Sequence, residues 1–243
     1  MKTRIQRFGY YLAIILIALG LSGCVYLRLL KLKKQFQHFE RYVLLENTCG
    51  LSMTFKKPVL FAKDVAWLLD GKPAIRARSG RNTLFKYDFK KMYPDDQARE
   101  TDVTQIALFF LFQEDKLYKV RFPKAFSRYI QPELLMGSLR SVGSGTVDKQ
   151  QRSVSATFPT RQQHLDKIIP TQSEVEHILG TPYRLTETSS STRLFYQYGV
   201  QVQPHELRGT LPIVRLWLSF SPGDHKIISA KVSLNGMVTA VHF

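Results

Sequence analysis

The feature that most constrains this fold is a pattern of residues that occurs twice along the chain. Residues 64–89, DVAWLLDGKPAIRARSGRNTLFKYDF, and residues 174–199, EVEHILGTPYRLTETSSSTRLFYQYG, each begin with a short amphipathic helix pattern and a Gly-x-Pro turn. From the proline onward the two segments align without a gap, and apolar residues then recur with a period of two. Such a period places side chains on one face of a strand. The chain therefore predicts two similar units, each with a helix that leads into a strand.

Further apolar runs follow this strand in both segments, and polar turns separate them. The runs are residues 105–112, 117–122, 214–220 and 227–234. Glu-Asp-Lys and Pro-Gly-Asp turns of this kind are typical of hairpins. A strand-like segment also precedes each helix, at 51–55 and at 153–158. We expect an α+β fold of two similar half-modules, each a short helix packed on an antiparallel sheet of three to four strands.

The ends of the predicted helices carry local signals. Gly71 and Gly180 each stand two residues before a proline. Glycine tolerates the left-handed conformation that ends a helix, and proline prevents the helix from continuing. Thr171 and Glu174 have the spacing of a capping box, in which both side chains satisfy free amides at a helix start. The half-modules are predicted at 49–137 and 151–243. They are joined by a linker over 138–150, because Gly143-Ser144-Gly145 is typical of a flexible joint.

The start of the chain has the order of an export signal, with cations in residues 1–7, an apolar core in residues 12–19, and then small residues. The sequence Leu21-Ser22-Gly23-Cys24 resembles the bacterial lipobox. This resemblance implies a signal peptide over 1–23 that is cleaved before Cys24, whose sulfur and new amine then carry fatty acyl groups such as palmitate. Val25 stands where an Asp would mark inner-membrane retention, so the implied location is the outer membrane, facing the periplasm.

The same residues allow a second interpretation. The stretch from Phe8 to Leu27 is uncharged and just long enough to span a bilayer as a signal anchor of the inner membrane. Cations that resist translocation follow it, namely Arg28, Lys31, Lys33 and Lys34. Both interpretations leave the rest of the chain outside the cytoplasm.

Residues 24–48 are predicted to form an amphipathic tether helix. Apolar residues recur at intervals of three and four, at Val25, Leu29, Leu32, Phe36, Phe39 and Val43. This spacing is one stripe of a helix. Two placements stay open along its length: the helix lies on an anionic leaflet with its cations at the head groups, or its stripe packs on the protein's own core.

The formal net charge of +16 favours an anionic partner, such as lipid head groups, lipopolysaccharide phosphates or an acidic protein surface. Export argues against nucleic acid. A second basic cluster, Arg76, Arg78 and Arg81, lies beside the first-half strand. The candidate contacts with an anionic surface are Arg28, Lys31, Lys33, Lys34, Lys86, Lys90 and Lys91. The alternative is that these charges are dispersed and only solvated.

The chain shows no catalytic constellation. Its six histidines lack the spacing of a zinc site, and Gly143-Ser144-Gly145 lacks the spacing of a nucleophile elbow. No glycine-rich phosphate loop precedes a helix. We therefore expect a protein that is not an enzyme and holds neither metal nor cofactor. Cys49, the second of two cysteines, is expected to be a small buried thiol.

The second half, residues 168–243, resembles the SmpA/OmlA family of BamE-like lipoproteins. The resemblance rests on the Leu-Gly-x-Pro turn at 179–182, the aromatic strand at 195–198, and a strand that ends in Phe220 before a polar turn. The lipobox is shared, and the first half matches more weakly at Gly71, Pro73, Tyr87 and Phe112. Two departures stand out: BamE is a single small module, and Pro170-Thr171 replaces its Gly-Met.

The resemblance implies an accessory role in the machinery that inserts β-barrels into the outer membrane. We therefore expect a membrane-anchored periplasmic lipoprotein that acts as a non-enzymatic interaction or scaffold module in envelope assembly, with an envelope protein as its partner. The alternatives are a binder of anionic lipid or lipopolysaccharide, and a signal-anchored inner-membrane protein of the periplasm.

Overall fold

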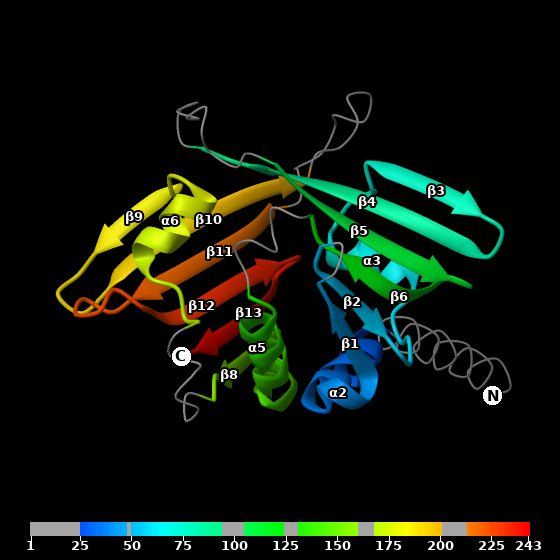
Figure 1. Cartoon of the computed structure of the whole chain (residues 1–243), viewed down its shortest axis with the longest axis horizontal. Coiled ribbons are helices and arrows are strands. Elements are labelled where there is room, and N and C mark those ends of the chain that lie inside the picture. Colours follow the sequence, from blue (N-terminus) through cyan, green and yellow to red (C-terminus); the bar gives the residue numbers. More distant parts are fainter. Residues whose placement is uncertain (1–24, 48–49, 94–104, 124–130, 160–167, 201–212) are drawn as a thin grey trace, which may run out of the picture.

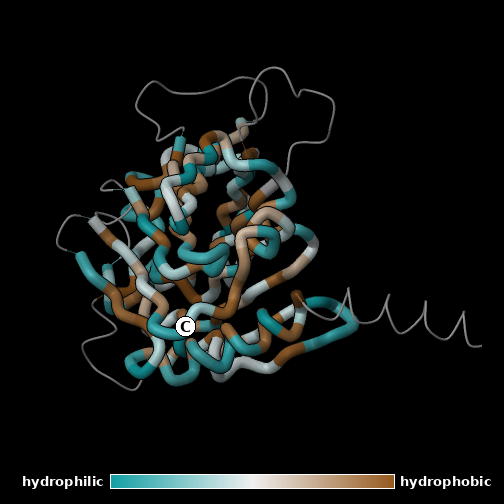
Figure 2. Tube along the Cα trace, turned by 90° about the vertical axis from the view of Figure 1, so that its right-hand side faces the viewer, coloured by the Kyte–Doolittle hydropathy of each residue, from teal (hydrophilic) through white to brown (hydrophobic). Residues whose placement is uncertain are grey.

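Alternating apolar and polar residues build the sheet of this protein. The computed structural model describes residues 25–47, 50–93, 105–123, 131–159, 168–200 and 213–243. Figure 2 shows hydrophobic and hydrophilic residues alternating along this part of the chain. In β10, for example, Leu194, Tyr196 and Tyr198 are buried, while the residues between them are only partly covered. The period of two thus directs one set of side chains into the core.

In the N-terminal half the described chain forms six strands. They are β1 (Val43–Glu46), β2 (Ser52–Phe55), β3 (Ile75–Ser79), β4 (Asn82–Lys91), β5 (Gln105–Gln113) and β6 (Lys116–Arg121). The four strands that the sequence predicts here are confirmed as β2, β4, β5 and β6. Strands β1 and β3 are additional; β1 lies where the tether helix was predicted, and all five residues of β3 are exposed, so burial imposes no pattern on them.

In the C-terminal half the described chain forms seven strands. They are β7 (Thr146–Asp148), β8 (Ser153–Thr157), β9 (Arg184–Glu187), β10 (Thr192–Val200), β11 (Ile213–Phe220), β12 (Ile227–Leu234) and β13 (Met237–His242). The predicted strands are confirmed as β8, β10, β11 and β12. Strands β7, β9 and β13 are additional, and β9 is exposed along its whole length like β3.

All thirteen described strands belong to one sheet, with the order β1-β2-β6-β5-β4-β10-β11-β12-β13-β8-β7 (Figure 1). Strand β3 pairs with the first part of β4, and β9 pairs with the first part of β10. Among the pairs of described strands, only β13–β8 is parallel. The sequence left open whether the halves form one sheet or two domains; they form one sheet, joined where β4 pairs with β10.

Five helices occur among the described residues. They are residues 25–37, α2 (Phe39–Tyr42), α3 (Ala62–Leu68), α5 (Pro132–Ser144) and α6 (Gln172–Leu179). The capping box at Thr171 and Glu174 is confirmed, and Gly180 ends α6 with a φ of 66°. The expected glycine end of α3 is wrong in detail, because Asp70, with a φ of 45°, takes the left-handed position before Gly71.

The two halves share contacts at corresponding positions. The hydroxyl of Tyr87 donates to the carbonyl oxygen of Gly71 at 3.0 Å, and that of Tyr196 donates to Gly180 at 3.1 Å. At the junction, Lys90 of β4 lies opposite Gly199 of β10, which is its counterpart when the segments are aligned from their prolines. These contacts favour the two similar half-modules that the sequence suggests, which stay a prediction.

The halves differ at their outer strands. In the N-terminal half β2 pairs directly and antiparallel with β6. In the C-terminal half β13 lies between β12 and β8. The C-terminal half of the sheet therefore contains one strand, β13, that has no counterpart between β6 and β2 in the N-terminal half.

One apolar core extends across both halves. It contains Phe85, Tyr87 and Phe112 from the first half and Tyr196 and Phe220 from the second. All five are at most 4% exposed, and each such large side chain stabilises the fold by about 1.5–3 kcal/mol when it is buried.

The linker predicted over 138–150 is wrong. Its first part is the end of α5, and β7 follows. The glycines serve close packing instead of flexibility: a Cβ atom at Gly143 would lie 2.2 Å from the backbone nitrogen of Gln37, and one at Gly145 would lie 2.6 Å from the carbonyl oxygen of Ser155.

The tether helix predicted over 24–48 is shorter than expected. Its described part ends at residue 37, α2 follows, and β1 begins at Val43. Leu29, Leu32 and Phe36 pack against the core. Of the two placements that the sequence allowed, the apolar stripe thus takes the one on the protein's own core.

Candidate functional site

A buried ion pair fixes the N-terminal helix to the first half. The Arg28 guanidinium donates two hydrogen bonds to the Asp64 carboxylate, from Nε at 2.6 Å and from a terminal nitrogen at 2.5 Å. Asp64 has no exposed surface and also accepts a hydrogen bond from the backbone N–H of Phe61 at 2.8 Å. The Arg28 guanidinium also lies 5.1 Å from the centre of the Phe61 ring. This bidentate geometry holds helix 25–37 against the start of α3.

Further hydrogen bonds connect the same helix to other elements. The Gln35 side-chain amide donates to the carbonyl oxygen of Lys57 at 2.6 Å, and Lys33 donates to that of Gly143 at the end of α5 at 2.8 Å. Arg140 of α5 pairs with Glu40 of α2. The N-terminal helix is therefore part of the folded body and is held from both halves.

The opposite side of the helix faces solvent. Leu27 is 59% exposed, and Lys31 and Lys34 are exposed at helical spacing from it. Together with the exposed Arg41 of α2, the two lysines form what we call the basic stripe. Cys24, the lipobox residues Leu21, Ser22 and Gly23, and Cys49 lie outside the described residues.

Two of the seven predicted anionic contacts are buried, which corrects that prediction. Arg28 forms the buried ion pair with Asp64 described above. Lys91 is 2% exposed. Its ammonium group donates to the carbonyl oxygen of Leu179, at the end of α6, and lies 5.4 Å from the centre of the Tyr196 ring. A cation is favourable at a helix C-terminus, so Lys91 has a structural role at the junction of the halves.

The remaining candidates are divided. Lys33 is partly buried through its bond to Gly143, and Lys86 forms an ion pair of 2.9 Å with Asp88. Lys31, Lys34 and Lys90 are exposed. The structure does not bring the seven residues together: Lys31 and Lys34 lie on the N-terminal helix, whereas Lys86 and Lys90 lie on the sheet.

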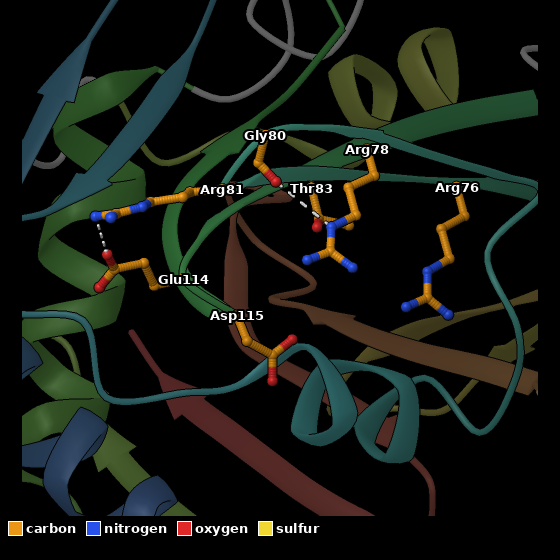
Figure 3. Close-up of a pocket in the computed structure, with 7 residues that line it drawn as sticks. All are labelled: Arg76, Arg78, Gly80, Arg81, Thr83, Glu114 and Asp115. Carbon is orange, nitrogen blue, oxygen red and sulfur yellow. Dashed lines mark hydrogen bonds and ion pairs between the residues drawn. The ribbon is translucent and has the colours of Figure 1, made fainter.

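Arginines line an open pocket of about 400 Å³ between the β3–β4 hairpin and the β5–β6 turn (Figure 3). The Arg76 guanidinium lies 5.5 Å from the centre of the Phe85 ring, and Nε of Arg78 donates to the carbonyl oxygen of Gly80 at 3.5 Å. Arg81 pairs with Glu114 at the far end, at 2.9 Å. Thr83 and Asp115 complete the lining. Arg76 and Arg78 have no carboxylate partner among the described residues.

A second basic surface lies on the sheet face that the helices leave uncovered, over β10 to β12. There Phe195 stacks on Trp217, with ring centres 5.1 Å apart and planes at 24°. The Tyr183 ring meets Phe195 edge to face at 5.8 Å, and the Lys231 ammonium lies 5.2 Å from the centre of the Trp217 ring. The sequence analysis missed this group, although Arg193-x-Phe195 and Arg215-x-Trp217 already place cations and aromatics on one strand face.

No described group of three or more His, Cys, Asp or Glu side chains is placed to hold a metal ion. The described helices include none with the length and apolar character of a membrane span. Comparison of the chain with protein-family models, with curated proteins and with solved structures gave no match.

Proposed function

We propose that this protein is a membrane-anchored, non-enzymatic interaction module of the cell envelope, attached through Cys24 and facing the periplasm. In this proposal the folded body presents its sheet to a partner protein of the envelope. The resemblance of residues 168–243 to BamE-like lipoproteins supports a place in outer-membrane assembly by analogy of fold and anchor.

The observation that carries the proposal is the docking of helix 25–37. Only Val25, Tyr26 and Leu27 separate Cys24 from Arg28, which is fixed to Asp64 inside the body. An anchor at Cys24 would thus hold the folded body directly at the membrane instead of on a long flexible tether. The exposed stripe of Lys31, Lys34 and Arg41 would then face anionic head groups.

Metabolic labelling with a clickable fatty acid tests this anchor in bacterial cells that express the full chain. We expect wild-type protein to be labelled and to fractionate with the outer membrane, and Cys24→Ala to lose the label. Absence of label from both forms would overturn the lipoprotein proposal. Recovery of the unlabelled wild type in the inner membrane would then establish the signal-anchor alternative.

A second candidate function is the binding of an anionic head group in the arginine pocket. Arg76 and Arg78 favour it, because they point into an open pocket and lack carboxylate partners among the described residues (Figure 3). A guanidinium offers paired donors that match the geometry of a phosphate group.

Calorimetric titration of the full chain with glycerol phosphate in zwitterionic nanodiscs tests the pocket. We expect saturable binding that weakens as salt is added and is lost in Arg76→Gln/Arg78→Gln. The control Lys149→Gln/Arg152→Gln removes the same charge from the exposed β7–β8 turn and should bind like the wild type. Equal loss in both variants would point to unspecific charge attraction and exclude the pocket.

A further inference from the structure

The stacked pair Phe195 and Trp217 is not part of the apolar core. The residues beside them in the same strands, Leu194, Tyr196 and Leu218, are at most 6% exposed and point inward. Because side chains alternate along a strand, Phe195 and Trp217 point to the opposite face. The two rings form a cross-strand pair and are partly covered. Outward-facing aromatic pairs of this kind are typical of contact surfaces.

Four cations surround this pair. Arg184 is the cross-strand neighbour of Phe195 on β9, and Lys231 is that of Trp217 on β12. Arg193 and Arg215 lie two residues before the rings, on the same face. All four cations are exposed, and none forms an ion pair with another described residue. We call these six residues the aromatic–basic patch.

No carboxylate of the described residues next to the patch offsets these charges on the same face. The described positions around the patch that share its face are Thr186, Gln197, Ser219, Ser229, Ser233 and Ala240, and none of them is acidic. A surface of one sign around partly exposed aromatic rings is complementary to an acidic surface with apolar side chains at its centre.

The patch lies on the opposite face of the sheet from the N-terminal helix. The inward residues of the same strands share one core with Leu29, Leu32 and Phe36 of that helix. If helix 25–37 lies at the membrane, the patch is directed away from that bilayer. The inference that the partner is a protein and not a lipid surface therefore rests on the proposed function. The inference that the partner is acidic rests on the patch alone.

We propose that the aromatic–basic patch is a docking surface for an acidic segment of a partner protein. Aromatic side chains of the segment contact Phe195 and Trp217, and its carboxylates pair with Arg184, Arg193, Arg215 and Lys231. Arginine and aromatic residues together are the residue types that dominate binding energy at protein interfaces.

Trp217 makes the contact directly measurable. The chain has two tryptophans, so Trp67→Phe leaves Trp217 as the single reporter. The full chain is placed in zwitterionic nanodiscs and titrated with a dinitrophenyl-labelled peptide of eight glutamates and two phenylalanines. The same peptide with glutamines in place of glutamates serves as the neutral probe. We expect saturable quenching of Trp217 by the acidic peptide only, and weaker binding at higher salt.

A matched pair of variants separates the patch from general charge. Arg193→Gln/Arg215→Gln/Lys231→Gln should lower the affinity by about tenfold or more, since each exposed ion pair contributes a factor of up to about five. Lys31→Gln/Lys34→Gln/Arg41→Gln removes the same charge from the helix stripe and should change affinity less than about twofold. Circular dichroism and thermal unfolding verify that both variants are folded.

Three results would overturn the inference. They are absence of quenching by the acidic peptide, equal loss of affinity in both variants, and quenching by anionic nanodiscs with brominated acyl chains instead of by the peptide. The last would assign the patch to a lipid surface. Loss of the anchor in the Cys24 experiment would leave the peptide titration unaffected, so failure of the proposed function and failure of the patch are distinguishable.

Discussion

At the scale of single residues, Asp64 has the largest share in positioning the N-terminal helix. Its carboxylate accepts two hydrogen bonds from Arg28 and one from the Phe61 backbone, and it has no contact with solvent. A buried pair of this kind adds little compared with an apolar replacement, but breaking it leaves an uncompensated charge. Asp64 therefore makes the docked position of the helix specific.

Asp64→Asn should lower the free energy of unfolding by about 3–5 kcal/mol, because it removes one charge of a buried, doubly hydrogen-bonded ion pair. Urea unfolding at neutral pH measures the change. Glu114→Gln is the matched control: it also removes the carboxylate partner of an arginine, but the Arg81–Glu114 pair is mostly exposed and should contribute less than about 1 kcal/mol. Similar effects of the two substitutions would contradict a fixing role for Asp64.

We expect ionisation of the Tyr87 hydroxyl to lower the stability of the fold at alkaline pH. Burial raises the pKa of Tyr87 from 10.0 to about 12. Below pH 10 the phenol is neutral in the folded and the unfolded chain. Between pH 10 and 12 it loses its proton first in the unfolded chain, so the unfolded state is favoured as the pH rises. Each unit of difference in pKa corresponds to about 1.4 kcal/mol.

We expect Tyr87→Phe to weaken this alkaline loss of stability, at a cost of about 1 kcal/mol at neutral pH for the hydrogen bond to Gly71. Urea unfolding at several pH values from 8 to 11.5 measures both effects. Tyr118→Phe, which leaves the Tyr87 hydroxyl in place, should keep the slope of the wild type. An unchanged slope in Tyr87→Phe would show that other groups cause the alkaline loss.

At the scale of secondary-structure elements, packing of helix 25–37 on α5 requires a residue without a side chain. A Cβ atom at Gly143 would lie 2.2 Å from the Gln37 nitrogen and 2.5 Å from the Phe36 carbonyl carbon. These are backbone atoms, so a change of side-chain rotamer does not relieve the overlap. The two helices must move apart instead.

Gly143→Ala should therefore destabilise the protein by about 1–3 kcal/mol or more, despite the higher helix propensity of alanine. Hydrogen exchange should show the loss first in helix 25–37 and α5. Gly223→Ala is the matched control, since a Cβ atom there has open space around it and the change should stay within about 0.5 kcal/mol. A neutral or stabilising effect of Gly143→Ala would contradict the close packing of the helices.

At the scale of the whole molecule, one sheet and one core unite the two halves. The β4–β10 junction and the core residues shared by both halves leave neither half with a closed apolar surface of its own. Two similar halves of this kind are expected to unfold as a single cooperative unit.

The two tryptophans test this cooperativity, because Trp67 lies in α3 of the first half and Trp217 in β11 of the second. Single-tryptophan variants Trp67→Phe and Trp217→Phe, each measured by urea unfolding, should give fluorescence transitions that coincide with the loss of secondary structure followed by circular dichroism in the same variant. A fluorescence transition of either reporter that precedes the loss of secondary structure in its own variant would show that the halves unfold separately.

Sequence patterns predicted β2, β4, β5, β6, β8, β10, β11 and β12 and missed the other five strands, two of which are fully exposed. Burial on one face imposes the period of two on β4 and β10, so their residues predict them. Strands β3 and β9 lie at exposed edges, where no such pattern is required. The predicted linker failed because glycine serves both flexible joints and close contacts, and only the neighbour, here Gln37, distinguishes these roles.

For the candidate sites, too, some features could be predicted from the sequence and others could not. The sequence by itself determined the α+β class, the capping box at Thr171, the apolar stripe of the N-terminal helix and the excess of positive charge, since each depends on residues close in the chain. Only the tertiary structure decided which cations stay exposed, because Arg28 finds its partner 36 residues away and Lys91 reaches the end of α6. Contacts between such distant residues do not follow from spacing along the chain. They decide which cations are buried in the structure and which remain on its surface.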